Sequence, residues 1–284
     1  MINIDNFKSE ILECPLCNHT NISSIGSLKY ASPLKFSTLE IKLETSPVLN
    51  CCNNCKSWFT NYPVPENKAM ELYTIGDGNK RWSHADFISD KDSKVVNFFN
   101  RALKPSLNIL DVGCNTGEFL DYASQKGCHT FGLELSTSSL ITANKKGHTC
   151  VDDISKLNDH KFDIITAFDL VEHLYQPKQF INQLLGYLKP QGKLIILTGN
   201  KNSLSAKILK NNWWYCNYPE HVVFPDENFF KKELQLEIID QIYCSASKIR
   251  AERWFLRLTN ALRQRNDLGI GHDHSLFVLG IPSK

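Results

Sequence analysis

Long apolar runs are missing from this sequence: its 284 residues contain no apolar stretch of about 18 residues, so they predict no membrane-spanning helix. The first residues, Met1 to Lys8, also lack the basic-then-apolar order of a signal peptide, and we therefore expect a cytoplasmic protein with no membrane partner. An excess of charge is absent as well, because 32 basic and 30 acidic residues leave a net charge of +2. Such a balance does not favour nucleic acid as the binding partner.

Cysteine, in contrast, is abundant: in a cytoplasmic chain, the ten cysteines are expected to be thiols or metal ligands rather than disulfides. Four of them form two Cys-x-x-Cys pairs that are separated by about 35 residues. At this spacing four thiolates can surround a structural zinc ion without leaving an open position. We therefore predict a zinc ribbon over residues 1–62, with Zn²⁺ bound by Cys14, Cys17, Cys52 and Cys55.

Two alternatives to this ligand set stay open at the level of sequence. Cys51 and His19 lie next to the predicted ligands, and either could replace one of them. A redox-active dithiol also uses the Cys-x-x-Cys motif, although the presence of two such pairs argues against it. Between the pairs, residues 38–44 alternate as a strand does.

The stretch 109–120 has the pattern of a strand, a tight loop and the start of a helix. Gly113 and Gly117 allow positive φ in the loop and let a ligand lie against bare backbone. The spacing Asp111-x-Gly113-x-x-x-Gly117 differs from the G-x-G-x-x-G of dinucleotide folds, which disfavours a nicotinamide oxidoreductase. About 20 residues later a second strand ends at Glu134, where a carboxylate would accept the hydroxyls of a ribose. The loop therefore predicts a nucleotide-like ligand.

Residues 105–284 alternate between strand and helix patterns, which predicts an α/β fold with a doubly wound sheet. The preceding residues 63–104 predict a helical linker or lid. We expect strands at 107–112, 129–134, 148–152, 162–168, 193–198, 236–243 and 275–281, and helices at 66–73, 87–103, 117–126, 137–146, 177–188, 226–234 and 247–264.

Four segments in this order, 111–117, 132–134, 162–174 and 188–197, together resemble the class I S-adenosylmethionine-dependent methyltransferases. Asn115 stands where many members have a glycine, and asparagine is one of the few other residues that tolerate the left-handed region. The resemblance implies S-adenosylmethionine as cofactor. It also implies a seven-stranded Rossmann-like sheet whose last strand is antiparallel to its neighbour.

The resemblance further implies which residues hold this cofactor. Gly113 and Cys114 would lie against its methionine part, Asp111 would reach its ammonium group, and Glu134 would take the ribose hydroxyls. Leu135 would lie beside the adenine. Asp153 would accept a hydrogen bond from the adenine amino group, and Asp152 could take this role instead. The complete implied set is Asp111, Gly113, Cys114, Asn115, Gly117, Glu134, Leu135, Asp153, Phe168 and Asp169. A surface or capping role is the alternative for the acidic residues.

In this class of enzymes the helices before the first strand form a wall or lid over the acceptor. Tyr73, Trp82 and His84 are therefore candidate acceptor contacts, with core packing as the alternative. The aromatic segment 213–224 is a second candidate, because it follows a central strand at its carboxyl end.

Tyr218-Pro-Glu-His221 resembles the Tyr-x-Glu-His signature of the C-methyltransferases that act on nucleotide-linked deoxysugars, which also begin with a four-cysteine zinc module. The resemblance implies that His221 is the general base, that Glu220 and Tyr218 bind the sugar, and that His173 assists. Imidazole suits proton transfer near neutral pH, and a structural role is the alternative for both histidines. The deoxysugar enzymes carry a further carboxyl-terminal domain that this chain is expected to lack, so O-methylation of another small hydroxylated molecule fits equally well.

We therefore expect an S-adenosylmethionine-dependent methyltransferase with a small, sugar-like or sugar-nucleotide acceptor, in polysaccharide or secondary-metabolite biosynthesis. An RNA methyltransferase is one alternative, although the Lys145-Lys146 and Lys231-Lys232 pairs are isolated. A non-catalytic protein that binds S-adenosylmethionine and zinc is the other. The sequence carries no pattern that predicts an oligomeric state.

Overall fold

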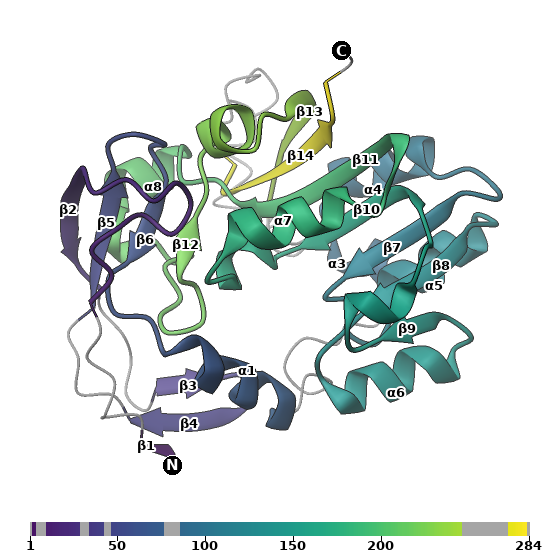
Figure 1. Ribbon diagram of the computed structural model, residues 1–284, viewed down its shortest axis with the longest axis horizontal. Helices are drawn as coiled ribbons and strands as arrows, with labels where there is room; N and C mark the ends of the chain where they lie inside the picture. The colour runs from purple at the N-terminus through teal and green to yellow at the C-terminus, as the bar shows by residue number, and fades with distance from the viewer. Residues whose placement is uncertain are drawn as a thin grey trace.

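A seven-stranded sheet forms the centre of the computed structural model, which describes residues 2–3, 10–28, 34–42, 47–76, 86–245 and 272–282 (Figure 1). The strands follow the order β13-β14-β11-β10-β7-β8-β9. They are β7 (Asn108–Val112), β8 (His129–Leu133), β9 (Thr149–Val151), β10 (Phe162–Phe168), β11 (Leu188–Gly199), β13 (Glu237–Cys244) and β14 (His274–Gly280). β14 runs antiparallel to both of its neighbours, β11 and β13, while the other strand pairs of this sheet in the described ranges are parallel. The predicted sheet with an antiparallel last strand is therefore confirmed.

Consecutive residues of the central strands pack on opposite faces of this sheet, because side chains alternate along a strand. Ile165 and Ile196 lie in one apolar cluster, which also contains residues of α7 (Pro177–Leu185). Their neighbours Ile164 and Ile195 lie in another, together with residues of α4 (Ser93–Ala102) and α5 (Glu118–Gln125). Both faces are thus covered by helices, and the doubly wound arrangement is confirmed.

Three predicted helices of the sheet domain form close to their expected bounds, as α5, α6 (Thr137–Lys145) and α7. The predicted helix at 87–103 is wrong in one respect, because the structure divides it into α3 (Phe87–Asp90) and α4. The carboxylate of Asp92 accepts a hydrogen bond from the backbone N–H of Lys94, so Asp92 caps a new helix instead of continuing the first.

The helix predicted at 226–234 forms close to its expected bounds, since residues 227–233 are helical and the last five of them form the π-helical turn Phe229–Glu233. Asp226 holds the preceding backbone through a hydrogen bond from the N–H of Asn228. Farther back, β11 begins at Leu188, so the helix expected to reach residue 188 ends at Leu185. The helix predicted at 247–264 lies outside the described residues.

The amino-terminal segment forms a four-stranded antiparallel sheet of order β12-β6-β5-β2, at the left of Figure 1. Its strands are β2 (Ile22–Ser27), β5 (Val48–Cys52), β6 (Trp58–Thr60) and β12 (Val223–Phe224). Although β12 comes late in the chain, Val223 and Phe224 pair with Phe59 and Trp58. The segment 218–221 is therefore joined to the cysteine-rich module by a strand pairing.

The remaining elements connect these two sheets. The strand expected at 38–44 appears as β4 (Leu39–Lys42), which pairs with β1 (Ile2–Asn3) and β3 (Leu34–Phe36). The helix expected at 66–73 is α1 (Glu66–Ile75). The others are α8 (Leu204–Leu209) and short 3₁₀ turns at Ile154–Leu157, Val171–His173 and Lys210–Asn212. None of the helices in the described ranges has the length and apolar character needed to cross a bilayer.

Candidate active site

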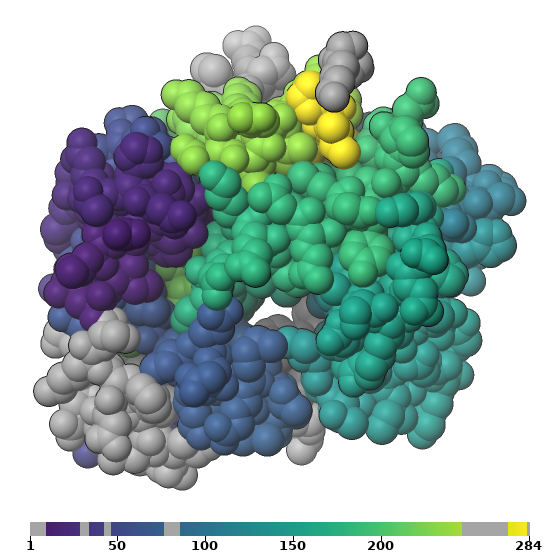
Figure 2. Space-filling model, viewed as in Figure 1, coloured from purple at the N-terminus to yellow at the C-terminus, as the bar shows by residue number. Residues whose placement is uncertain are grey.

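A cavity of about 660 Å³ opens at the carboxyl ends of β7, β8, β9 and β10 and extends to α1 and α7. Figure 2 shows this region as a hollow between the blue residues of α1 and the green residues of the segment that carries α7. The carboxyl ends of parallel strands are where open α/β sheets bind ligands, and the volume is that of a small-molecule site. The cavity is therefore the candidate active site.

Nearly all the predicted cofactor residues line this cavity: Asp111, Gly113, Cys114, Asn115, Glu134, Leu135, Asp153, Phe168 and Asp169, with Asp152 beside them. Gly117 does not line it but has φ +86° at the start of α5, where an added Cβ would lie 3.0 Å from the ring of His148. Asn115 has φ +47°, which explains why asparagine is tolerated in the loop. The fold thus brings together residues that are up to about 60 positions apart in the sequence.

Asp111 is a buried carboxylate at the floor of the cavity, where its Oδ1 accepts a hydrogen bond from Thr166 Oγ1 at 2.6 Å. Burial raises the pKa of Asp111 to about 7, and the bond from Thr166 offsets this only in part. An ammonium group beside this carboxylate would stabilise its ionised form. The site therefore fits the amino-acid part of S-adenosylmethionine.

Glu134 lies at the neighbouring strand end, and its carboxylate is fixed by the backbone N–H groups of Asn115 (2.9 Å) and Ser136 (2.7 Å). Each carboxylate oxygen keeps a further lone pair that can accept from a hydroxyl group. Leu135 is 38% exposed although it is apolar, so its side chain is free to cover a flat ring. Asp153 is also at the rim, where the backbone N–H of Ser155 donates to it. This wall suits an adenosine.

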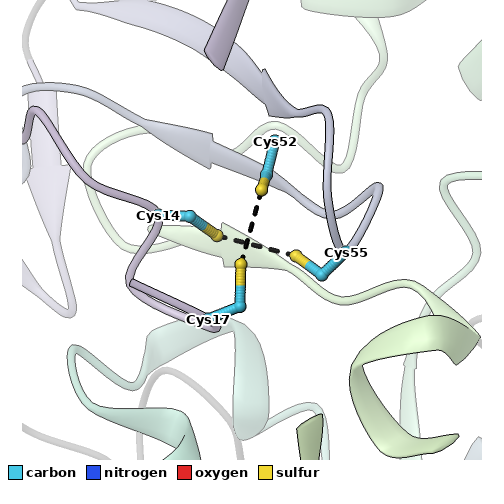
Figure 3. Close-up of side chains that lie close together, drawn as sticks. All are labelled: Cys14, Cys17, Cys52 and Cys55. Carbon is cyan, nitrogen blue, oxygen red and sulfur yellow. Dashed lines mark hydrogen bonds between the residues drawn. The ribbon is translucent and has the colours of Figure 1, made fainter. Parts of the chain in front are cut away.

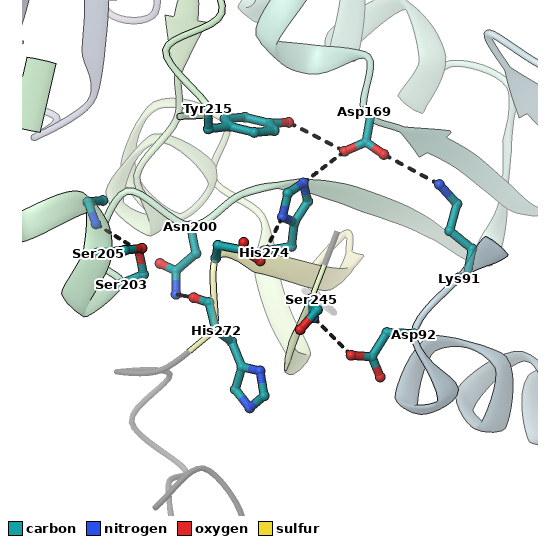
Figure 4. A network of polar contacts seen from close by, with 12 residues as sticks. Lys91, Asp92, Asp169, Asn200, Ser203, Ser205, Tyr215, Ser245, His272 and His274 are labelled. Carbon is teal, nitrogen blue, oxygen red and sulfur yellow. Dashed lines mark hydrogen bonds and ion pairs between the residues drawn. The ribbon is translucent and has the colours of Figure 1, made fainter. Parts of the chain in front are cut away.

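Phe168 packs in an aromatic group with Phe87 and Phe119, whose ring centroids lie 5.8 and 5.0 Å away. The next residue, Asp169, has φ +46° and lies at the centre of a charged network (Figure 4). Its carboxylate contacts Lys91 Nζ at 3.5 Å and His274 Nε2 at 3.2 Å.

The charges in this network shift one another's pKa. Burial alone would raise the pKa of Asp169, but the positive charges of Lys91 and His274 lower it below its usual value. For His274, burial acts to lower the pKa, yet Asp169 and Asp273 raise it to about 9. Asp169 is thus an ionised, fixed group at the edge of the cavity.

At the other end of the cavity, Tyr73 and His173 face the space between α1 and the sheet. His173 Nδ1 lies 2.8 Å from Tyr73 Oη and 3.0 Å from the carbonyl oxygen of Glu220. With the proton on Nδ1, His173 donates to the Glu220 carbonyl and Nε2 keeps the lone pair; with Nδ1 unprotonated, Tyr73 Oη donates to Nδ1 instead. Tyr73 therefore lines the cavity, and its contact with an acceptor stays a prediction, while Trp82 and His84 lie outside the described residues.

His221 stands behind His173, with the two ring centroids 4.7 Å apart, and does not line the cavity itself. Its Nδ1 donates to the carbonyl oxygen of Tyr215 at 2.7 Å, which again leaves the lone pair on Nε2. Burial and the adjacent His173 lower the pKa of His221 well below its usual value. His221 is thus held neutral, as a proton acceptor or a metal ligand must be.

Tyr218 and Glu220, the predicted acceptor ligands, are buried and do not line the cavity. Tyr218 Oη donates to the carbonyl oxygen of Tyr62 at 2.8 Å. Glu220 Oε1 accepts from the backbone N–H of Ser37 at 2.7 Å. Both side chains therefore brace the loop against the amino-terminal segment, and their direct contact with an acceptor stays a prediction.

Several residues of the site were not expected from sequence. Glu172 is fully buried between the predicted Asp169 and His173, and Tyr215 Oη donates to its carboxylate. Tyr215 belongs to the aromatic segment noted above, and Glu172 belongs to a segment of the methyltransferase resemblance. Lys91 and His274 gave no local signal, because they reach Asp169 from distant parts of the chain.

The four predicted zinc ligands form a second buried cluster, in which all sulfur atoms lie within 4.8 Å of one another (Figure 3). Cys14 Sγ lies 3.6 Å from Cys55 Sγ, and Cys17 Sγ lies 3.4 Å from Cys52 Sγ. A tetrahedral zinc ion with Zn–S bonds of about 2.3 Å requires sulfur atoms about 3.8 Å apart, so the cluster fits such an ion. Cys51 is outside this group, since its sulfur is directed to backbone carbonyls.

Comparisons with known proteins agree with the fold. A family model described as a methyltransferase domain matches residues 82–236, more than half of the chain. The ubiquinone biosynthesis O-methyltransferase of Hahella chejuensis is 26% identical over 158 residues, which cover 50% of this chain and 66% of that protein. Its mitochondrial counterpart in Dictyostelium discoideum is 30% identical over 119 residues, 35% of this chain and 37% of that protein.

The matched regions thus span less than two thirds of these relatives. A chain from the complex between the Haloferax volcanii Trm112 methyltransferase activator and a methyltransferase has the same fold, with a TM-score of 0.50 at 16% identity. That match covers 67% of this chain and 89% of the other. The finer resemblance to deoxysugar C-methyltransferases has no support among these relatives and stays a prediction. The chain belongs to the class I S-adenosylmethionine-dependent methyltransferases.

Proposed function

We propose that the protein transfers the methyl group of S-adenosylmethionine to a small hydroxylated, sugar-like acceptor. One observation supports this most directly: a single cavity carries carboxylates suited to the cofactor at one end and the imidazole of His173 at the other. An in-line displacement requires donor and acceptor to meet in one space, with a group nearby that favours loss of the acceptor proton.

In this proposal the cofactor occupies the end formed by the loops after β7, β8 and β9. Asp111 holds the ammonium, Glu134 the ribose hydroxyls and Asp153 the adenine amino group. Leu135 covers the adenine ring. The cavity continues from this end to His173, so a methyl group carried by the sulfonium would be within the same space as His173.

The acceptor end is lined by side chains that recognise hydroxyl groups. Gln176 Nε2 donates to Glu66 Oε2 of α1 at 3.1 Å, and the amides of Gln179 and Gln183 also line the cavity. Amide and carboxylate groups form hydrogen bonds with sugar hydroxyls, while tyrosine rings offer flat apolar surfaces for a sugar face. This mixture supports a polyhydroxylated acceptor over a purely apolar one.

The acceptor proton is lost at the pair formed by His173 and His221. In the transfer step, a bond forms between the acceptor atom and the methyl carbon, and the bond from that carbon to sulfur breaks. S-adenosylhomocysteine leaves as a neutral thioether, and the proton passes to the imidazole pair. The related enzymes named above are O-methyltransferases, which supports a hydroxyl oxygen as the acceptor atom; a carbon acid beside a ketone is the second form of the same chemistry.

Zinc bound by the four cysteines would have a structural task. The cysteine cluster packs in the same apolar cluster as the large sheet, and β6 of its module pairs with β12, which follows His221. We infer that this zinc ion fixes the loop that carries His221, and that it takes no part in the methyl transfer.

The test is calorimetric titration with S-adenosylhomocysteine, followed by a methyl-transfer assay with a panel of sugar nucleotides, free sugars, glycans and RNA. The proposal predicts micromolar binding of S-adenosylhomocysteine, no binding of NAD, and release of S-adenosylhomocysteine only with a hydroxylated small molecule. Methylation of RNA alone would contradict the acceptor class. Failure of S-adenosylhomocysteine to bind would contradict the enzyme function itself.

A further inference from the structure

Glu172, His173 and His221 meet at the acceptor end of the cavity, where one potential ligand atom from each lies within 4.8 Å of the other two. We propose that these three side chains bind a divalent transition-metal ion that activates the acceptor. The inference rests on the proposed function, because the acceptor oxygen is the natural occupant of the remaining coordination positions.

The orientation of both imidazoles is the one that metal-binding histidines adopt. In such sites one ring nitrogen binds the metal while the N–H of the other is fixed by a carbonyl or carboxylate. Nδ1 of His173 faces the carbonyl oxygen of Glu220, and Nδ1 of His221 faces that of Tyr215. In the tautomer in which each Nδ1 donates to its carbonyl, each Nε2 is the available ligand atom.

The third ligand, Glu172, is held equally firmly. Thr198 Oγ1 donates to its Oε2 at 2.9 Å, and Tyr215 Oη donates to its Oε1. Each oxygen keeps a second lone pair, so these bonds orient the carboxylate without using all of its acceptor capacity. A carboxylate that is fully buried also gains from a cation nearby, since nothing else in its hydrogen-bond set carries positive charge.

Backbone contacts hold the ligand-bearing segments together before any ion binds. Glu172 and His173 are consecutive in one 3₁₀ turn, Val171–His173. The backbone N–H of Val222, next to His221, donates to the carbonyl oxygen of Glu172 at 2.8 Å. A shift of about 1 Å in side-chain position would bring three such atoms to the spacing of about 3 to 3.5 Å that metal bonds of 2.0–2.2 Å require.

The donor set also indicates which ion binds. Two imidazoles and one carboxylate suit zinc, manganese, iron or cobalt, and differ from the four soft thiolates of the cysteine cluster. Three protein ligands leave positions open, as in catalytic rather than structural sites. Of the three side chains only His173 lines the cavity, so an acceptor hydroxyl would have to reach the ion from the side of His173.

Coordination would change how the acceptor loses its proton. An ion held by these three side chains would lower the pKa of a bound acceptor hydroxyl, whose proton would pass to water while its oxygen forms the bond to the methyl carbon. The carbon–sulfur bond then breaks and S-adenosylhomocysteine leaves. The lone pairs on both Nε2 atoms serve the ion in this form of the reaction.

The experiment is a Mn²⁺ titration of protein loaded with a single zinc ion per chain, which the four thiolates take up, followed by electron paramagnetic resonance, because Mn²⁺ is a hard ion that thiolates bind poorly. We expect one bound Mn²⁺ per chain, with spin-echo modulation from directly coordinated imidazole nitrogen. His221→Ala and Glu172→Gln should each weaken Mn²⁺ binding at least about tenfold. His129→Ala, which removes an exposed histidine at the opposite end of β8, should bind Mn²⁺ like the wild type.

The nitrogen modulation is measured on the wild-type protein, so it decides the question even where a variant does not fold. Absence of bound Mn²⁺, absence of nitrogen coordination, or unchanged binding in both folded variants would overturn the metal site. S-adenosylhomocysteine binding is measured on the same samples. If S-adenosylhomocysteine binds but Mn²⁺ does not, the proposed function stands without the metal site. If Mn²⁺ binds at this triad but S-adenosylhomocysteine does not bind, the methyltransferase function fails and the metal site remains.

Discussion

Replacing Asp111 by asparagine should stabilise the cofactor-free protein at high pH, although it removes a residue of the binding site. Asp111 is buried, and this burial raises its pKa to about 7, compared with 3.8 for an exposed aspartate. The folded state therefore binds a proton more tightly than the unfolded state does. The resulting loss of stability is absent below about pH 4, grows between pH 4 and 7, and is complete above pH 7.

The magnitude follows from the shift: 7 − 3.8 is about 3 pKa units, which at about 1.4 kcal/mol per unit gives about 4 kcal/mol. Urea denaturation at pH 5 and at pH 9 measures it. Asp111→Asn should exceed the wild type in free energy of unfolding by several kcal/mol at pH 9, and by much less at pH 5. Asp159→Asn, at an exposed position, is the matched control and should show no such difference.

Ionised Asp111 destabilises the cofactor-free fold, but the same ionised carboxylate should strengthen cofactor binding. The ammonium of S-adenosylhomocysteine stabilises ionised Asp111, so wild-type affinity should rise as the pH passes through about 7. Asp111→Asn should bind about 10- to 100-fold more weakly at pH 8, the usual effect of losing a charged hydrogen bond, and without that rise. Equal stability of the two proteins at pH 9, together with equal affinity, would refute this account of Asp111.

Three further substitutions test other parts of the site. His221→Ala should leave S-adenosylhomocysteine affinity nearly unchanged and lower turnover by about 10² to 10⁴; loss of cofactor binding would show that His221 has been misplaced. The double variant Cys14→Ser and Cys52→Ser should lose the bound zinc and melt at a lower temperature, while Cys51→Ser should keep both; unchanged zinc content in the double variant would remove the zinc assignment. Gly132→Ala places a Cβ 2.5 and 2.6 Å from two buried sulfur atoms, so it should destabilise the fold and weaken cofactor binding, and a wild-type melting curve would contradict that contact.

The large sheet and the cofactor end of the cavity could be predicted because their signals are local. Each strand is a short apolar run, and each predicted carboxylate stands at or just beyond the carboxyl end of such a run, so the rule for parallel strands places them together. The two glycines and the asparagine of the loop 113–117 indicated from sequence alone that its backbone adopts positive φ. These features need no knowledge of which distant segments pack together.

The acceptor end could not be predicted in the same way, because it depends on contacts over long sequence distances. His274 reaches Asp169 only because β14 inserts between β11 and β13. Tyr218 and Glu220 were expected to face an acceptor, yet their side chains hold backbone groups of the amino-terminal segment. The pairing of β12 with β6, which fixes this whole loop, joins residues far apart in the chain.

The break between α3 and α4 shows the same limit at short range. The apolar pattern of 87–103 is helical throughout, and only the capping bond of Asp92 reveals the interruption. That interruption lies beside Lys91, whose ammonium contacts Asp169. The side chain of Asp92 competes with the helical backbone and starts α4 at a new N-terminus. Lys91 therefore lies outside the packing helix α4, where it contacts the site.

The central claim is that one cavity holds the cofactor at its carboxylate end and presents its methyl group to His173. A crystal structure of the complex with S-adenosylhomocysteine tests this most directly. The account predicts that the ribose hydroxyls bond to Glu134, that the ammonium lies at Asp111, and that the sulfur faces His173. A nucleoside bound away from Glu134, or a sulfur atom directed away from His173, would contradict it.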